Sequence, residues 1–408
     1  MTIATTTSSA VTATAPGPAS VTLPPRLRRL RCLDDFEAAA RRHLPRPVFG
    51  YIAMAAETRR SFDDNRSAFD DYRFMPRVLN DVSVRSTATT LFGRDYAAPF
   101  GIAPLGLSAL SAYRGDLVLA RAAARAEIPM IMSGSSLIPL EAVAKAQPDA
   151  WFQAYLPGDV PNITALIKRI GNAGFRHLVL TVDTPVAPNP DNFARAGFSS
   201  PLRPGLGLAW QGVSHPRWLF GTFLRTLVRH GMPHFENNFA QRGAPILSRS
   251  VTRDFTGRGH LNWEHVRLIR AQWPGVLIVK GILHQDDARM ACALGADGII
   301  VSNHGGRQLD GAIASLRALP GIVAACPDIP VMLDSGIRRG ADVLKALALG
   351  ARFVFVGRPF AYAAAVGGEA GAGHAAGLLQ QEISRNMAML GVTRIDALDA
   401  RVHLVAQR

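Results

Sequence analysis

Eight short apolar runs recur along the chain from Pro99 onward, and stretches with helical periodicity separate most of them. This alternation is typical of strands in a parallel sheet that is buried on both faces. Eight strand-plus-helix repeats close into a barrel, so the sequence predicts an α/β fold, a (β/α)8 TIM barrel that starts near residue 97. The runs begin near Pro99, Pro129, Trp151, His177, Val276, Gly298, Pro330 and Phe353.

Three further segments surround this pattern. Residues 1–28 are rich in Thr, Ala, Ser and Pro and lack the pattern of a secretion signal, so we expect a disordered tail before a single domain over residues 29–408. Residues 33–95 look like helical segments plus a short hairpin that cap one end of the barrel. Residues 190–261, after the fourth strand, are too long for an ordinary loop and predict an insertion.

Composition excludes several classes of protein. The formal charge is +14, but no basic run interleaved with aromatic residues resembles a nucleic-acid-binding module. An anionic substrate, a phosphate-bearing cofactor or an acidic lipid surface explains the charge better. No apolar run reaches the roughly 18 residues that span a bilayer. The three cysteines form no CxxC pair, which argues against a zinc site or disulfide framework and favours structural roles in a reducing compartment.

The polar residue at the end of each apolar run is expected at the mouth of the barrel, where barrel enzymes carry their chemistry. A purely structural sequence would instead scatter such residues over both ends. The residues at these positions are Ser133, Gln153, Tyr155, Thr181, Asp183, Lys280, Ser302, His304, Asp334 and Arg358.

The segment from Ser302 to Asp310, SNHGGRQLD, places an imidazole and a guanidinium three residues apart at this mouth. A 2-hydroxy acid needs both groups, since the planar fork of Arg307 suits a carboxylate and His304 can take a proton. The alternative is a solvated loop. The glycines favour the first interpretation because they let the backbone approach a ligand.

Two charged residues end neighbouring strands. Asp183, in the LTVD run, could orient His304 and stabilise its imidazolium form. Lys280 lies in an apolar setting, where an unpaired ammonium is costly, and so needs an anionic partner such as a reduced flavin ring. An ion pair with a carboxylate of the barrel is the alternative for Lys280.

The last two strands end in glycine- and arginine-rich loops, residues 334–340 and 356–358. Barrels usually hold phosphate at this pair of positions, on backbone N–H groups and cationic side chains. A phosphorylated ligand is therefore expected there. No Walker loop and no GxGxxG follows a strand, which argues against ATP or a dinucleotide.

Together these motifs closely resemble the FMN-dependent 2-hydroxy acid dehydrogenases and oxidases over about residues 33–390. The most specific matches are SNHGGRQLD, LTVDTP, FQAY, LIVKG and DSGIRRGADVLKALALGA. The resemblance implies FMN as cofactor, His304 as base paired with Asp183, and Arg307 with Tyr51 on the substrate carboxylate. It implies that Tyr155 contacts the substrate hydroxyl and that Lys280 lies beside flavin N1 and O2. The implied FMN shell is Ala103, Pro104, Leu105, Ser133, Gln153, Thr181, Lys280, Ser302, Asp334, Ser335, Gly336, Arg338, Gly357 and Arg358.

Departures from the family pattern concern the substrate pocket. Many members carry a second carboxylate-binding arginine seven residues after the aspartate of the fourth strand, where this chain has Pro190, and Arg195 is a candidate substitute. Ser135 aligns with a tryptophan that narrows the pocket of glycolate oxidase. A substrate larger than glycolate is therefore expected.

Within the family, Gly106, Ser335 and the HPRW and RHGMP segments look most like mandelate dehydrogenase, a subgroup that uses a membrane acceptor. Residues 218–228 place apolar side chains on one helical face and arginines on another, as a helix lying on a membrane surface would. The alternative is a helix packed on the barrel or on a neighbouring subunit. The apolar residues of that face are Phe220, Phe223, Leu224, Leu227 and Val228, and the arginines are Arg225 and Arg229.

The sequence thus predicts a cytoplasmic FMN enzyme, peripheral on the cytoplasmic face of the membrane, that oxidises a mandelate-like acid or lactate and passes electrons to a quinone or cytochrome. By resemblance it forms a homotetramer. An oxidase of the same fold that makes hydrogen peroxide is the nearest alternative, followed by a non-catalytic flavin-binding membrane protein and a phosphosugar isomerase or aldolase.

Overall fold

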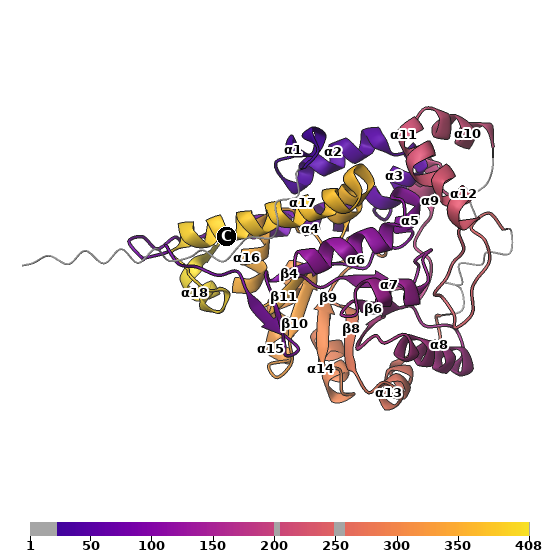
Figure 1. The fold of residues 1–408 in the computed structure, drawn as a ribbon. Coiled ribbons are helices and arrows are strands. Elements are labelled where there is room, and N and C mark those ends of the chain that lie inside the picture. The colour runs from indigo at the N-terminus through magenta and orange to yellow at the C-terminus, as the bar shows by residue number, and fades with distance from the viewer. Residues whose placement is uncertain (1–22, 200–204, 249–257, 408) are drawn as a thin grey trace, which may run out of the picture.

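The computed structural model describes residues 23–199, 205–248 and 258–407. At its centre lies an eight-stranded parallel sheet in the order β4-β11-β10-β9-β8-β7-β6-β5 (Figure 1). A parallel bridge between Ile102 and Met130 joins the two outer strands, so the sheet closes into the predicted barrel. The strands are β4 (Phe100–Ile102), β5 (Ile131–Ser133), β6 (Trp151–Ala154), β7 (His177–Thr181), β8 (Val276–Ile282), β9 (Gly298–Val301), β10 (Val331–Asp334) and β11 (Phe353–Val356).

A helix follows each barrel strand and packs on its outer side. In α8, Asp159 caps the first turn by accepting a hydrogen bond from the backbone N–H of Asn162, and Ile163, Leu166 and Ile170 are fully buried. The helices are α6 (Gly115–Arg125), α7 (Leu140–Ala146), α8 (Val160–Asn172), α13 (Trp263–Gln272), α14 (Gln285–Ala293), α15 (Ser315–Ala325), α16 (Gly340–Ala348) and α17 (Arg358–Leu390), the last interrupted by non-helical backbone at Gly368.

Large apolar side chains from alternate strand positions fill the barrel, among them Trp151, Met332 and Phe353, each fully buried. The hairpin of β2 (Thr89–Leu91) and β3 (Arg94–Tyr96) packs Leu91 and Tyr96 against this cluster. It therefore closes the amino end of the barrel. The sequence predicted that the hairpin and the N-terminal helices cap the same end of the barrel. In the structure the hairpin lies at the amino end and the N-terminal helices lie at the carboxyl end.

The N-terminal helices lie over the carboxyl end. Asn65 and Asn303 exchange side-chain hydrogen bonds of 2.8 and 3.0 Å, and Asp310 accepts from the backbone N–H of Ser61, which ties α4 to the loop after β9. Figure 1 shows α2 running alongside α17. The helices are α1 (Pro25–Arg28), α2 (Leu33–His43), α3 (Arg46–Ala53), α4 (Arg60–Ser67) and the 3-10 helix η1 (Ala68–Asp71).

The boundary expected for the tail needs correction. Residues 1–22 lie outside the described part of the chain, but residues 25–28 form α1. Leu27 is fully buried, and it packs against Gly367 of α17 so closely that a Cβ at that glycine would lie 2.9 Å from it. Burial of this one leucine fixes a segment whose composition alone suggests disorder.

The insertion contains α9 (Asp191–Ala196), α10 (Leu206–Val213), α11 (Pro216–Trp218), the π-helical turn η2 (Leu219–Leu224) and α12 (Arg225–His230). The π turn shifts the helical phase, so the expected single apolar face is split. Phe220 and Val228 are 66% and 84% exposed, whereas Phe223 stacks on buried Trp218 at 5.4 Å. No helix in the described ranges is long and apolar enough to cross a membrane.

The remaining elements close the domain. A short helix, α5 (Ser108–Ser111), precedes α6, and the chain ends in η3 (Ile395–Ala397), α18 (Ala400–His403) and β12 (Leu404–Ala406). Strand β1 (Tyr72–Phe74) pairs antiparallel with β12, so that Tyr72 lies opposite Ala406.

Candidate active site

A cavity of about 850 Å³ opens at the carboxyl end of the barrel. The predicted site residues that line the cavity are Tyr51, Ala103, Pro104, Leu105, Tyr155, Lys280, His304, Arg307, Asp334, Ser335, Gly336, Arg338, Gly357 and Arg358. Five other predicted site residues do not line the cavity but lie around its floor, at the ends of strands or at the start of the loops that follow: Ser133, Gln153, Thr181, Asp183 and Ser302.

His304 lies between a carboxylate and a phenol. Its Nδ1 is 3.0 Å from Asp183 Oδ1, and its Nε2 is 3.4 Å from the Tyr155 hydroxyl. Burial raises the pKa of Asp183, but its interactions with His304 and Lys280 outweigh burial and hold that pKa below its usual value. Burial, reinforced by Asp183, raises the pKa of Tyr155. The arrangement keeps Asp183 ionised and Tyr155 a neutral donor.

The backbone of the loop after β9 explains its sequence. His304, Gly305 and Gly306 have φ values of +58°, +67° and +71°, three left-handed residues in a row. A Cβ at position 306 would lie 2.5 Å from the backbone nitrogen of Phe62. The two glycines are therefore required for the turn that directs His304 into the cavity.

Lys280 is buried within a polar cluster. Its Nζ donates to Ser302 Oγ at 2.8 Å and lies 3.1 Å from Asp334 Oδ2. Burial lowers the pKa of Lys280, and the carboxylates of Asp334 and Asp183 raise it above its ordinary value. The ion pair that the sequence left as an alternative is thus present, and the ammonium still borders the cavity.

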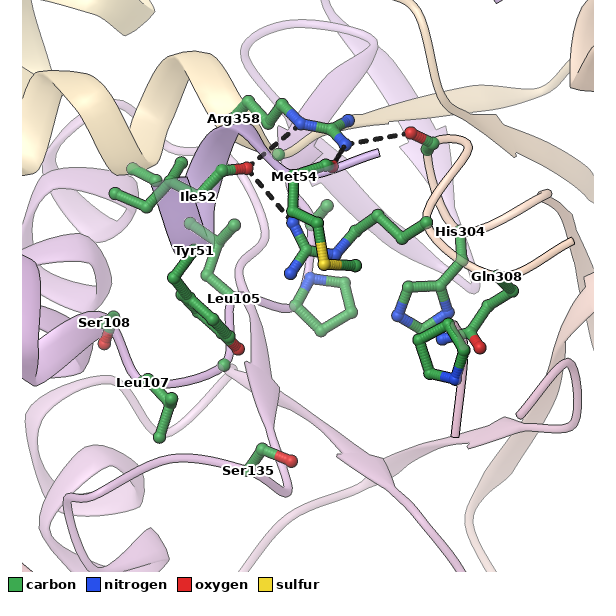
Figure 2. A pocket seen from close by; sticks show the side chains of 18 of the residues that line it. Tyr51, Ile52, Met54, Leu105, Leu107, Ser108, Ser135, His304, Gln308 and Arg358 are labelled. Atoms are coloured by element: carbon green, nitrogen blue, oxygen red, sulfur yellow. Dashed lines mark hydrogen bonds between the residues drawn. The ribbon is translucent and has the colours of Figure 1, made fainter. Parts of the chain in front are cut away.

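Arg307 and Arg358 both line the cavity. Arg307 donates to the carbonyl of Ile52 at 3.1 Å and lies 5.2 Å from the Tyr51 ring centroid. Arg358 donates to the carbonyls of Ile52, Met54 and Gly305, and burial, followed by Arg307, lowers its pKa to about 9. Figure 2 shows Tyr51 and His304 on opposite sides of one space, with Arg358 bound above it.

Three buried polar atoms on the cavity floor have no hydrogen-bond partner within the described residues: the acceptor Asp183 Oδ2 and two donors. The donors are the amide nitrogen of Gln153 and the hydroxyl of Thr181, although Gln153 Oε1 accepts from Ser133 Oγ at 3.2 Å. Unpaired buried donors at a strand end indicate a polar ligand. A flavin ring offers acceptors for them, and Lys280, Arg338 and the loop at Gly336 offer cationic and N–H groups, so the residues fit FMN.

Sequence reasoning missed an aromatic wall supplied by the insertion. Phe198 lies 4.9 Å from Tyr51 between ring centroids, and Phe193 lies 6.1 Å from Tyr51 and 5.7 Å from Phe198. Both phenylalanines line the cavity, as does Pro190. Their five-residue spacing fits neither helical nor strand periodicity, so no pattern could have identified them.

The suggested substitute for the missing arginine does not reach the site. The guanidinium of Arg195 pairs with Asp191 at 2.9 Å, and its side chain is 69% exposed. A different cation, Arg258, is buried and lies 4.9 Å from the centroid of the Tyr155 ring.

Comparison with known proteins agrees with this geometry. The model of a family described as FMN-dependent dehydrogenase matches residues 40–405. The L-lactate dehydrogenase of Caulobacter sp. (strain K31) is 40% identical over 90% of this chain and 97% of its own length. The L-lactate oxidase of Lysinibacillus sphaericus (strain C3-41) is 39% identical over 90% of this chain and 91% of its own length.

Among solved structures, the monotopic membrane protein (S)-mandelate dehydrogenase superimposes with a TM-score of 0.83 and 35% identity, covering 93% of this chain and all of the other. The predicted resemblance, barrel fold and cofactor are confirmed: the chain belongs to the FMN-dependent dehydrogenase family and is an FMN-dependent oxidoreductase.

Proposed function

We propose that this enzyme oxidises an L-2-hydroxy acid to the 2-keto acid. The contact that carries the proposal is the hydrogen bond of 3.0 Å between His304 Nδ1 and Asp183, made beside Tyr155 and Arg307 in one cavity. It pairs a proton acceptor with a carboxylate that can stabilise the imidazolium. Bound FMN supplies the two-electron acceptor.

In this mechanism Arg307 and Tyr51 bind the substrate carboxylate from one side of the cavity. Tyr155 donates its hydroxyl hydrogen bond to the substrate hydroxyl, because its raised pKa keeps it protonated. His304 Nε2 accepts the proton that the substrate loses, while Nδ1–H remains bound to Asp183. Holding the acid in this orientation is worth several orders of magnitude in rate.

The FMN site is proposed at the predicted shell. The backbone of Ala103, Pro104 and Leu105 and the side chains of Ser133, Gln153, Thr181 and Ser302 would hold the flavin ring. Lys280, kept protonated by Asp334 and Asp183, would stabilise negative charge at N1 and O2. The loops holding Asp334, Ser335, Gly336, Arg338, Gly357 and Arg358 would hold the phosphate.

The aromatic wall favours a substrate with an aryl group. Phe193, Phe198 and Tyr51 form stacked or tilted pairs on one side of the cavity. Gly106 lies beside this wall, and a side chain there would crowd it, since a Cβ at Gly106 would lie 2.7 Å from the Tyr51 hydroxyl oxygen and 3.3 Å from the Ser135 Cβ. We propose mandelate or a related 2-aryl acid as the preferred substrate, with lactate as a poorer one.

Exposed apolar side chains on the insertion support attachment to a membrane surface. Trp210, Val213, Phe220 and Val228 are each more than 60% exposed. A basic groove of about 500 Å³ adjoins α11 and is lined by Arg26, Arg29, Arg42, Arg217 and two histidines. Apolar anchors beside cations suit an acidic lipid surface. We therefore propose a peripheral position on the cytoplasmic face and a quinone or cytochrome as electron acceptor. From the family resemblance we also propose a homotetramer.

The oxidase alternative has specific support, because a relative named L-lactate oxidase is as similar as those named dehydrogenase. One experiment addresses both. The enzyme is mixed anaerobically with L- and D-mandelate and L-lactate while flavin absorbance is followed, and then turned over in air with and without a quinone analogue. Bleaching by L-mandelate with little peroxide is expected. Absence of bleaching by any 2-hydroxy acid would refute the proposed function, and stoichiometric peroxide would favour the oxidase.

A matched variant locates the chemistry. His304→Ala is expected to keep bound FMN and to lose reduction by every acid in the panel, because its ring accepts the substrate proton. Thr184→Ala, one residue beyond Asp183 and buried away from the cavity lining, serves as control. Normal turnover in the His304 variant would contradict the assignment.

A further inference from the structure

Two cysteine thiols meet outside the active site. Cys292, in the last turn of α14, and Cys326, the residue after α15, have sulfur atoms 2.8 Å apart. A disulfide bond is about 2.05 Å long, so bond formation needs a sulfur movement of less than about 1 Å. We propose that Cys292 and Cys326 are an oxidisable pair that a peroxide converts into an intramolecular disulfide, a function separate from the proposed catalysis.

The barrel topology brings these residues together. Helices α14 and α15 follow adjacent strands β8 and β9, and they pack against each other. Both run back along the barrel, so their carboxyl ends lie together at its amino end. Gln285, at the start of α14, lies against Gly321 of α15, where a Cβ would be 2.5 Å from the Gln285 amide nitrogen. The close approach therefore extends along the helix pair and is not confined to the sulfur atoms.

The two thiols differ in their access to solvent. Cys326 is 3% exposed, and burial, reinforced by neighbouring Cys292, raises its pKa to about 12. Cys292 is only half-buried. Because the oxidant must reach the sulfur from solvent, Cys292 is the residue that meets the oxidant and Cys326 is the one that resolves the product.

The reaction balances with hydrogen peroxide as oxidant. The Cys292 sulfur bonds to one peroxide oxygen as the O–O bond breaks, which yields a sulfenic acid and one water. The Cys326 sulfur then bonds to the Cys292 sulfur and displaces the hydroxyl as a second water. The two thiol hydrogens leave in the waters, sulfur is oxidised, and peroxide is reduced.

From the position of the two thiols we expect the disulfide to raise Tm without changing the rate of flavin reduction. His304 and the substrate cavity lie at the carboxyl end of the barrel, opposite the ends of α14 and α15 that carry the thiols. The bond would close a loop of 34 residues. A disulfide that closes a loop of that length lowers the entropy of the unfolded chain. Divided by the unfolding entropy of a domain of this size, the resulting stabilisation corresponds to a rise in Tm of about 4 °C. The rate of flavin reduction should not change.

Peptide mass spectrometry tests the proposal directly on the holoenzyme. Trypsin cleavage after Arg289, Arg307, Arg317 and Arg338 places the two cysteines in separate peptides, 290–307 and 318–338. After removal of reductant, addition of hydrogen peroxide and alkylation, the unreduced digest should contain these peptides joined, two hydrogens lighter than their sum. The number of free thiols per chain, titrated in denaturant, should fall from three to one, and dithiothreitol should reverse both changes.

Serine variants supply the controls. Cys292→Ser should give no joined peptide and no peroxide-induced rise in Tm, whereas Cys32→Ser should behave as the wild type because Cys32 lies at the start of α2. Three free thiols in the wild type after peroxide would overturn the proposal. So would Cys292 recovered as sulfinic acid without a joined peptide. Neither outcome depends on whether a 2-hydroxy acid is the substrate.

Discussion

The contribution of Asp183 to proton transfer can be worked out from the structure. Asp183→Asn keeps the size of the side chain and an oxygen that can accept from His304 Nδ1, but it removes the negative charge 3.0 Å from that nitrogen. Unit charges about 4 Å apart at an effective dielectric constant of about 20 attract by about 4 kcal/mol. The remaining neutral hydrogen bond recovers about 1 kcal/mol. A net loss of about 3 kcal/mol predicts flavin reduction slowed by about 150-fold.

The assay is anaerobic stopped-flow reduction of bound flavin by saturating L-mandelate, with FMN content measured on the same sample. Asp396→Asn, which removes an exposed carboxylate paired with Arg394, is the matched control and should reduce at the wild-type rate. A rate within threefold of wild type in the Asp183 variant would refute the reasoning. Loss of FMN together with activity would instead assign Asp183 a structural role.

Three further predictions concern stability, specificity and location. Burial raises the pKa of Asp116 to about 6, so the folded state holds a proton that the unfolded chain releases, and stability should fall by about 3 kcal/mol in total as the pH rises from well below 4 to well above 6. Asp116→Asn should flatten that decline in Tm, and an unchanged slope would contradict the account. Phe198→Ala should lower kcat/KM for mandelate by about tenfold with lactate nearly unaffected, and equal losses in steady-state assays would argue against the aryl pocket. Phe220→Ser combined with Val228→Ser should reduce sedimentation with phosphatidylglycerol vesicles, whereas the control Val402→Ser should not, and equal sedimentation of all three proteins would count against membrane attachment.

The barrel could be predicted from the sequence because its signal is local and repeated. Each apolar run is long enough to reveal a buried strand, and the helix after it fixes the parallel connection. The residues at the mouth of the barrel could be predicted as well, because the carboxyl ends of parallel strands in a barrel lie together at one end. His304 and Asp183, separated by 121 positions, were paired in this way, and their ring and carboxylate are in contact.

The features that sequence reasoning missed depend on tertiary contacts. Leu27 is ordered by a glycine of α17 some 340 positions later, and Phe193 and Phe198 form a wall only because Tyr51 stacks with them. The π turn at residues 219–224 displaced the expected apolar face by inserting extra residues into one helical turn. None of these contacts leaves a periodic trace in the chain.

The pairing of β1 with β12 has a consequence for biosynthesis. Tyr72 and Arg73 leave the ribosome long before their partners Ala406 and Val405, so β1 has an open edge throughout translation of the barrel. At the usual elongation rate of roughly 5–20 residues per second, that interval lasts tens of seconds. The last few residues act as a latch, and nascent chains that stall before them should expose an edge strand for chaperones to bind.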